Sequence, residues 1–237
     1  MPFPFKKAPL VAAIAFASAA SVTHAQMLEE VIVTAQKRTE SLQDVPISVS
    51  AIQGDKLEES GIANMSALAD YVPNLYISDA AVNTNIYLRG TGSGNNQGFE
   101  QSVGMYIDGI YMGRGRQYRS PFVDIERVEV LRGPQGTLFG KNTVAGAINV
   151  TTASPDVGEE TNGSIAVSLE DNDGFISEGY ISGSPADNLG LRFAFKYNEN
   201  DGTFDNDYLN EDEINMDDTM YRFTGVWQPS DNLDVNF

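Results

Sequence analysis

The feature that most constrains this sequence is a repeated alternation of apolar and polar side chains across residues 158–237. In the stretch 191–197, for example, leucine, phenylalanine and tyrosine alternate with Arg192, Ala194 and Lys196. Alternation with a period of two residues predicts β-strands that have one apolar and one polar face. Further strands are predicted on the same pattern at 164–169, 176–182, 220–227 and 233–237.

The connections between these predicted strands alternate in length. Residues 184–188 and 229–232 are short and rich in Pro, Asp and Asn, whereas 199–218 is long and acidic. Short turns on one side and long polar loops on the other are typical of an outer-membrane β-barrel. A soluble β-sandwich or meander shows the same strand alternation, so this segment alone leaves both folds open.

The first 25 residues have the layout of a secretory signal peptide. Lys6 and Lys7 precede an uncharged apolar run, 9–20, and the small-x-small sequence 23–25 follows before Gln26. The apolar run is shorter than the roughly 20 residues that a membrane-spanning helix needs. We therefore expect export of the mature chain to the periplasm or beyond.

Composition excludes several classes of function. The chain has no cysteine, and its one histidine, His24, lies in the predicted leader. Ser-His-Asp or Cys-His catalysis and zinc sites built on His or Cys are therefore excluded for the mature chain. A carboxylate pair such as Glu126 and Glu129 would point to opposite faces of one strand. We expect no enzyme activity, no metal site and no cofactor.

Charge divides the chain near residue 155. Residues 159–237 hold 18 acidic and 3 basic side chains, whereas the whole chain carries a net charge of −18. Ser154-Pro155 interrupts the pattern at the point where the composition shifts, which predicts a domain boundary there. The acidic balance argues against nucleic acid as a partner, because phosphate binding needs a basic surface.

Residues 26–155 predict a small α+β domain. The Asp108-Gly109 pair between two apolar arms predicts a type I′ turn in a hairpin over 105–112. Asn64 is a candidate N-cap of one of two short helices, and Gly90–Gln101 is rich in Gly, Asn and Ser, which predicts a surface loop. Short strands and helices are predicted at 31–34, 45–52, 56–59, 65–69, 75–78, 86–88, 125–131 and 146–152, with a polar stretch at 36–44.

Five segments of this region, in order, resemble the TonB-dependent outer-membrane receptors. Residues 29–35 (EEVIVTA) resemble the TonB box, and 44–49 (DVPISV) resemble the first plug strand. The most specific resemblance is IERVEVLRGPQGTLFG at 125–140, which continues to GAINV at 146–150. The two remaining segments are IYLRG at 86–90 and the hairpin YIDGIY at 106–111.

The resemblance implies an α+β plug domain followed by the first antiparallel strands of a 22-stranded transmembrane β-barrel. The implied organisation is a signal peptide (1–25), TonB box and linker (26–43), plug domain (44–155) and first four or five strands (158–237). Because a barrel must close, we expect its remaining strands to lie outside this sequence.

The resemblance also implies a function and its partners. The receptor would import a scarce bulky nutrient, such as a ferric siderophore-like chelate, cobalamin or a glycan, across the cell outer membrane. TonB of the inner-membrane energy-transducing complex, outer-membrane lipid and the small-molecule or chelate ligand would be its partners. A secreted β-rich binding or adhesion module without transport activity is the alternative, and dependence on detergent separates the two.

Three sets of site residues are expected. A β-prone segment on a loose polar tether can add a strand to a partner's sheet, although an edge strand of the plug is the other interpretation. The predicted TonB-binding residues are Glu30, Val31, Ile32, Val33, Thr34 and Ala35. The resemblance implies that Arg89 and Arg132 face acidic groups of the barrel wall, where the alternative is ordinary surface charge. The predicted ligand-facing residues are Asn95, Asn96, Gln97, Arg114, Arg116 and Arg119, whose arginines suit an anionic ligand but equally a solvated basic cluster.

Overall fold

The computed structural model describes residues 31–34, 37–80, 83–94, 100–170, 174–200, 204–206, 208, 211–213, 216–230 and 232–237. The predicted signal peptide, 1–25, lies outside the described residues. None of the helices in the described ranges is both long enough and apolar enough to cross a membrane.

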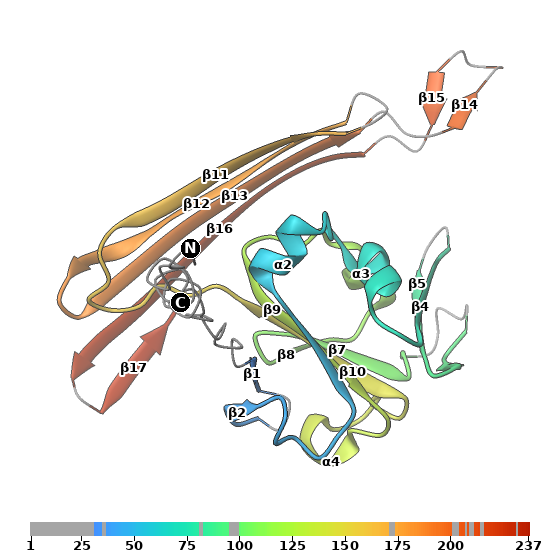
Figure 1. Ribbon diagram of the computed structural model, residues 1–237, viewed down its shortest axis with the longest axis horizontal. Coiled ribbons are helices and arrows are strands. Elements are labelled where there is room, and N and C mark those ends of the chain that lie inside the picture. Colours follow the sequence, from blue (N-terminus) through green and yellow to red (C-terminus); the bar gives the residue numbers. More distant parts are fainter. Residues whose placement is uncertain are drawn as a thin grey trace, which may run out of the picture. The chain divides into compact units, whose positions relative to one another are not determined.

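A mixed five-stranded sheet forms the centre of the plug (Figure 1). Its strand order is β3-β9-β10-β7-β8, in which β10 runs parallel to β7 and antiparallel to β9. The strands are β3 (Val49–Gln53), β9 (Ile125–Arg132), β10 (Gly146–Thr152), β7 (Val103–Ile107) and β8 (Ile110–Met112). Asp108 and Gly109 have positive φ angles of 49° and 78° between β7 and β8, which confirms the predicted tight hairpin turn.

Two short helices cover one face of this sheet. They are α2 (Gly54–Glu59) and α3 (Met65–Tyr71). The Asn64 side chain accepts a hydrogen bond from the Ala67 backbone N–H at 2.9 Å, as the predicted N-cap requires. Side chains of α2 and α3 pack with alternate residues of β9 and β10 to form the core, which includes Leu57, Met65, Leu68, Val128, Val130, Ile148 and Val150.

A smaller sheet and two short turns complete this half of the chain. The order of the three-stranded sheet is β4-β5-β6. Its strands are β4 (Leu75–Asp79), β5 (Thr84–Leu88) and β6 (Thr91–Gly92), and the helical turns are η1 (Gly115–Arg119) and α4 (Gly136–Phe139).

The N-terminal part of the plug is more ordered than its polar sequence predicts. β1 (Ile32–Val33) pairs antiparallel with β2 (Glu40–Ser41), so the described part of the polar stretch, 37–44, contains a short strand. An ion pair between Arg38 Nε and Glu40 Oε1, 2.7 Å apart, supports the connection. The predicted strand 45–52 begins only at Val49, because Pro46 offers no backbone N–H for a ladder.

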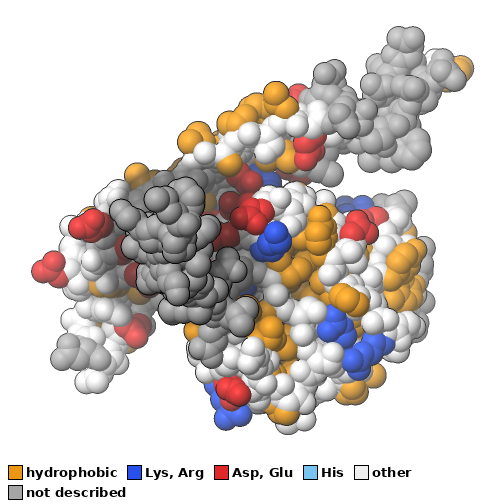
Figure 2. All heavy atoms as spheres, viewed as in Figure 1, with side chains coloured by type: hydrophobic (Ala, Val, Ile, Leu, Met, Phe, Trp, Pro, Cys, Tyr) orange, Lys and Arg blue, Asp and Glu red, His pale blue; other side chains and the backbone are white. Residues whose placement is uncertain are grey.

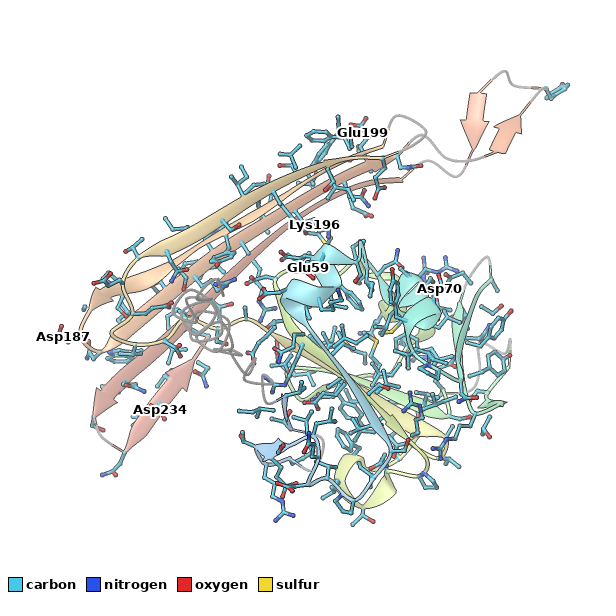
Figure 3. The ribbon with its side chains drawn as sticks, in the orientation of Figure 1. Glu59, Asp70, Asp187, Lys196, Glu199 and Asp234 are labelled. Carbon is cyan, nitrogen blue, oxygen red and sulfur yellow. The ribbon has the colours of Figure 1, made fainter. Side chains whose placement is uncertain are left out.

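An antiparallel sheet follows the plug in sequence, with the order β11-β12-β13-β16-β17. The strands are β11 (Asn162–Leu169), β12 (Phe175–Ala186), β13 (Leu189–Asn200), β16 (Met216–Ser230) and β17 (Leu233–Asn236). In Figure 3, Asp187 lies at the tight-turn end of these strands and Glu199 towards the other end. The structure thus confirms the predicted fold class of an α+β plug followed by antiparallel strands. The predicted long loop contains a hairpin that the sequence did not indicate, β14 (Phe204–Asn206) with β15 (Glu211–Glu213).

Candidate functional site: the partner segment and the plug contacts

The register of the antiparallel sheet shows which side chains lie on the same face. Ile181 pairs with Phe193, and Phe193 pairs with Phe223, so these apolar side chains share one face. Side chains on this face are exposed, with Val167 at 60% and Tyr221 at 72% of their full area. Figure 2 shows apolar side chains along these strands. The face therefore leaves apolar surface without protein cover in the described chain.

The opposite face of the sheet is polar and contacts the plug. Arg192 of β13 donates to Asp124 of the plug from Nε at 2.9 Å and from Nη2 at 2.5 Å. Both side chains are largely buried, with 12% and 4% of their areas exposed. The guanidinium carbon also lies 3.7 Å from the centre of the Tyr180 ring. A bidentate, buried and stacked arginine of this kind fixes the position of its partner.

A second contact involves the turn of the β7–β8 hairpin. The Asp108 carboxylate accepts from the Thr152 backbone N–H at 2.9 Å and from the Thr152 hydroxyl at 2.8 Å. Arg222 Nη2 of β16 lies 3.0 Å from the same carboxylate and also contacts the Thr152 hydroxyl. One strained turn residue therefore connects β10 of the plug with β16.

A third polar group lies beside α2. Lys196 Nζ is 2.8 Å from Glu178 Oε2 on the polar face of the sheet (Lys196 is labelled in Figure 3). The pKa of Glu58 on α2 is raised, first by burial of its carboxyl and then by the negative charge of Glu178. This contact therefore differs from those of Asp124 and Asp108, because it brings two carboxylates, Glu58 and Glu178, near each other.

The predicted TonB-binding segment is docked on the plug. Val33 is fully buried, whereas 48% of the Ile32 side chain is exposed. The Thr34 backbone N–H donates to Glu129 Oε1 at 2.6 Å, and the Thr34 hydroxyl donates to the same oxygen at 3.2 Å. Val31 is half-buried; Glu30 and Ala35 lie outside the described residues.

The two arginines predicted to face a barrel wall lie next to each other. Arg132 donates within the plug, to the Pro73 carbonyl at 3.2 Å and to the Ser50 hydroxyl at 2.6 Å. Its pKa is lowered, first by burial and then by the positive charge of Arg89. In the described ranges neither arginine has a carboxylate partner. Their predicted contact with a barrel wall stays a prediction.

The predicted ligand-facing arginines have different surroundings. Arg119 donates from Nε to the Thr84 hydroxyl at 3.2 Å and from Nη2 to the Ala80 carbonyl, so it holds the β4–β5 hairpin. Arg116 on η1 and Arg114, the residue just before it, are exposed. Asn95, Asn96 and Gln97 lie outside the described residues. All three arginines of this predicted set are exposed, and Arg119 differs in that it also bonds to the β4–β5 hairpin.

Sequence reasoning missed the three carboxylates that organise these contacts. Asp108 and Asp124 have φ angles of 49° and 55°, a left-handed conformation that Asp tolerates better than most residues. Glu129 is fully buried in a central strand. A charged residue between two valines of a central strand is a signal that it has buried partners, although it does not say which.

Comparison with known proteins identifies the domain in this part of the chain. Residues 41–147 match the model of the TonB-dependent receptor plug domain. The pesticin receptor of Yersinia pestis is 30% identical over 161 residues, which are 67% of this chain and 23% of that receptor. The vitamin B12 transporter BtuB of Vibrio vulnificus is 31% identical over 149 residues, which are 59% of this chain and 23% of that protein.

Solved structures share the fold. The ferric yersiniabactin uptake receptor FyuA of Yersinia pestis superposes with a TM-score of 0.71 at 27% identity, covering 78% of this chain and 29% of that one. The ferripyoverdine receptor of Pseudomonas aeruginosa shares the fold, with a TM-score of 0.71 at 19% identity over 87% of this chain and 26% of that one. The chain thus spans less than a third of the length of these proteins. Through its plug domain and the antiparallel strands that follow, the chain belongs to the TonB-dependent receptors.

Proposed function

We propose that this chain is part of an outer-membrane transporter that imports a scarce, bulky nutrient with energy supplied through TonB. The observation that carries this proposal is the two-faced sheet after the plug. One face leaves large apolar side chains exposed, whereas the other forms ion pairs with Asp124 and Asp108 of the plug. A plug bound to the polar side of lipid-facing strands is the arrangement that a plugged transporter requires.

The strand lengths and the exposed face support a place in the outer membrane. β12 and β13 have 12 residues each and β16 has 15, more than the roughly 9–11 residues that a tilted strand needs to cross a bilayer. Outer-membrane lipid would cover Val167, Phe193 and Tyr221. A secreted soluble module would hold the same side chains in water, so the exposed face favours the transporter.

TonB would bind the segment Glu30–Ala35. β-prone residues near the chain's start suit addition of a strand to a partner's sheet, in which backbone hydrogen bonds supply the affinity. TonB would then pull on a segment that reaches the plug core through Val33, which is fully buried. Force applied there would act on the plug itself.

The ligand class follows from charge and from the relatives. Related receptors are named for ferrioxamine B, pesticin and vitamin B12. Arg114 and Arg116 offer two exposed cations that suit an anionic ferric chelate, and Asn95, Asn96 and Gln97 would add polar contacts. Arg119 would contribute indirectly, by holding the β4–β5 hairpin.

The paired cations Arg89 and Arg132 would contact carboxylates of the barrel wall. Two adjacent guanidinium groups repel each other, and a nearby carboxylate relieves that repulsion. The lowered pKa of Arg132 fits a position that a nearby carboxylate would stabilise.

The proposed organisation is the predicted one, with a signal peptide at 1–25, a TonB box and linker at 26–43, a plug at 44–155 and the opening strands of a 22-stranded barrel at 158–237. The role is transport and not catalysis, without a resident cofactor and without nucleic acid.

Uptake tests the proposal. Cells that express the natural protein would be supplied with radiolabelled iron as several ferric chelates, and separately with labelled cobalamin. The proposal expects accumulation of at least one probe, and expects that accumulation to stop when TonB is deleted. Accumulation that persists without TonB would contradict the energy source, and recovery of the protein in the soluble fraction would contradict the location.

A further inference from the structure

Glu129 is a fully buried carboxylate surrounded by hydrogen-bond donors. It lies in β9, the second strand of the sheet order, between β3 and β10. Its oxygens accept from the Thr34 backbone N–H at 2.6 Å, from Arg127 Nε at 3.1 Å and from Asn149 Nδ2 at 3.2 Å. The Thr34 hydroxyl adds a bond of 3.2 Å. One carboxylate therefore joins the predicted partner segment to two strands of the plug.

An ionised carboxylate suits this position because it only accepts hydrogen bonds. All the groups that contact it are donors, and a carboxylate has acceptor sites for each of them. A glutamine of the same shape would turn its own amide N–H groups towards Arg127, Asn149 or Thr34. The charge also strengthens each bond relative to a neutral acceptor.

The hydrogen bonds divide into a permanent set and a removable set. Arg127 and Asn149 lie on β9 and β10 of the plug sheet, so the sheet positions their bonds to Glu129. Both also donate to the Thr34 hydroxyl, from Arg127 Nη2 at 3.1 Å and from Asn149 Nδ2 at 3.4 Å. The bonds from Thr34 exist only while that segment is docked with Val33 buried. If the segment leaves, Glu129 is still paired, so release does not leave an unpaired buried charge.

We propose that Glu129 is the anchor that holds the TonB-binding segment on the plug, and so sets how often that segment is available to TonB. This inference rests on the proposed function, since it concerns access to the segment assigned to TonB. In the docked state, the Thr34 N–H is used by Glu129, and Val33 pairs with Glu40 of β2. The Thr34 N–H and the edge of β1 that faces β2 are therefore already occupied in the docked state.

The consequence is that weakening the anchor strengthens partner binding. A ligand that binds only a minor state has an apparent Kd equal to its intrinsic Kd divided by the fraction in that state. Loss of a charge-assisted hydrogen bond changes the equilibrium between the docked and released segment by about tenfold. A variant that loses this anchor therefore binds TonB with higher apparent affinity. General damage to the plug would not produce such a gain.

Hydrogen exchange of the Thr34 amide tests docking without TonB. The natural protein in detergent would be compared with Glu129→Gln and with the control Glu126→Gln. Glu126 is the neighbouring carboxylate, also pairs with Arg127, and makes no described hydrogen bond to Thr34. We expect the Thr34 amide to exchange about tenfold faster in Glu129→Gln and at an unchanged rate in Glu126→Gln. The protection of Ile148 and Val150 in β10 should stay the same in both variants.

Binding of the TonB C-terminal domain is the second readout. We expect its apparent affinity to rise, up to about tenfold, for Glu129→Gln and to stay unchanged for Glu126→Gln. If Thr34 exchange responds but TonB binds neither protein, the anchor stands and the proposed TonB site is wrong.

Two results would overturn the anchor. The first is an unchanged exchange rate of the Thr34 amide in a Glu129→Gln protein whose β10 keeps its protection. The second result comes from another variant, Thr34→Val, which is used if Glu129→Gln also lowers the protection of β10. Thr34→Val removes the Thr34 hydroxyl, and with it the bonds to Glu129, Arg127 and Asn149, while the Thr34 backbone N–H keeps its bond to Glu129. We expect exchange of the residue 34 amide to be about threefold faster in this variant, and an unchanged rate overturns the proposal.

Discussion

Asn64 holds the beginning of α3 with one hydrogen bond, from the Ala67 backbone N–H at 2.9 Å. The first N–H groups of a helix lack partners within the helix, so a side-chain acceptor at this position stabilises it. The sequence predicts this cap because Asn precedes a short apolar run that ends before Pro73. The residue thus acts locally, and its effect can be predicted from the sequence.

Replacing Asn64 by alanine should destabilise α3 by about 1 kcal/mol, because the cap bond is lost. Hydrogen exchange of the α3 amides would measure this as roughly fivefold less protection. Asn64→Asp keeps an acceptor at the same place and serves as the control. Equal protection in the alanine and natural proteins would show that the cap contributes nothing.

Glu129, Asp124 and Asp108 show where residue-level prediction ends. Their partners Thr34, Arg192 and Arg222 are far away in sequence, at separations of 95, 68 and 114 residues. Local spacing carries no information about such pairs. The Asp108-Gly109 turn was predictable because its signal is confined to adjacent residues, but its ion pair with Arg222 was not.

Among the elements, the strands after the plug were the most predictable. Their alternation is long enough to identify β11, β12, β13, β16 and β17, and the register then places apolar side chains on one face. Two polar elements, β2 and the β14–β15 hairpin, were not predicted. β2 and the β14–β15 hairpin have polar sequences, and their pairing with neighbouring strands outweighs weak intrinsic preference.

The helix α2 should respond to pH through Glu58. Its raised pKa means that the folded state retains a proton that the unfolded chain has lost, since burial and Glu178 disfavour the carboxylate. The stability contributed by this group is complete below the ordinary pKa of 4.5 and is lost as pH rises through the raised pKa.

Glu58→Gln should therefore increase protection of the α2 amides at pH 7 and have no effect near pH 4. Exchange measured across that range would show the difference. Glu59→Gln is the matched control, because Glu59 lies on the same helix and pairs with Lys56 at 3.2 Å. A benefit of Glu58→Gln that is equal at both pH values would contradict this explanation.

At the scale of the whole molecule, ion pairs connect the plug to the strands that follow it. Asp124 and Arg192 form the most buried of these contacts. Removing one member of a buried pair leaves a charge without a partner and typically costs about 3–5 kcal/mol. Neither the order of the plug strands nor these contacts could be predicted from local pattern, because both depend on how distant segments meet.

A double-mutant cycle tests that connection. Asp124→Asn and Arg192→Met should each lower the resistance of the plug to denaturant, and the double variant should lose less than the sum of the two. We expect a coupling of about 1–3 kcal/mol, because the residues contact each other directly. Additive effects would show that the pair does not hold plug and strands together.

The central claim is that a backbone strand at Val31–Thr34 passes force from TonB to the plug. Binding of the TonB C-terminal domain to the natural protein, to Val33→Pro and to Val33→Ala tests it most directly. Proline removes a backbone donor, whereas alanine keeps that donor and only shortens the side chain. The account predicts that Val33→Pro loses at least about tenfold in affinity while Val33→Ala still binds. Equal binding of the proline variant and the natural protein would contradict it.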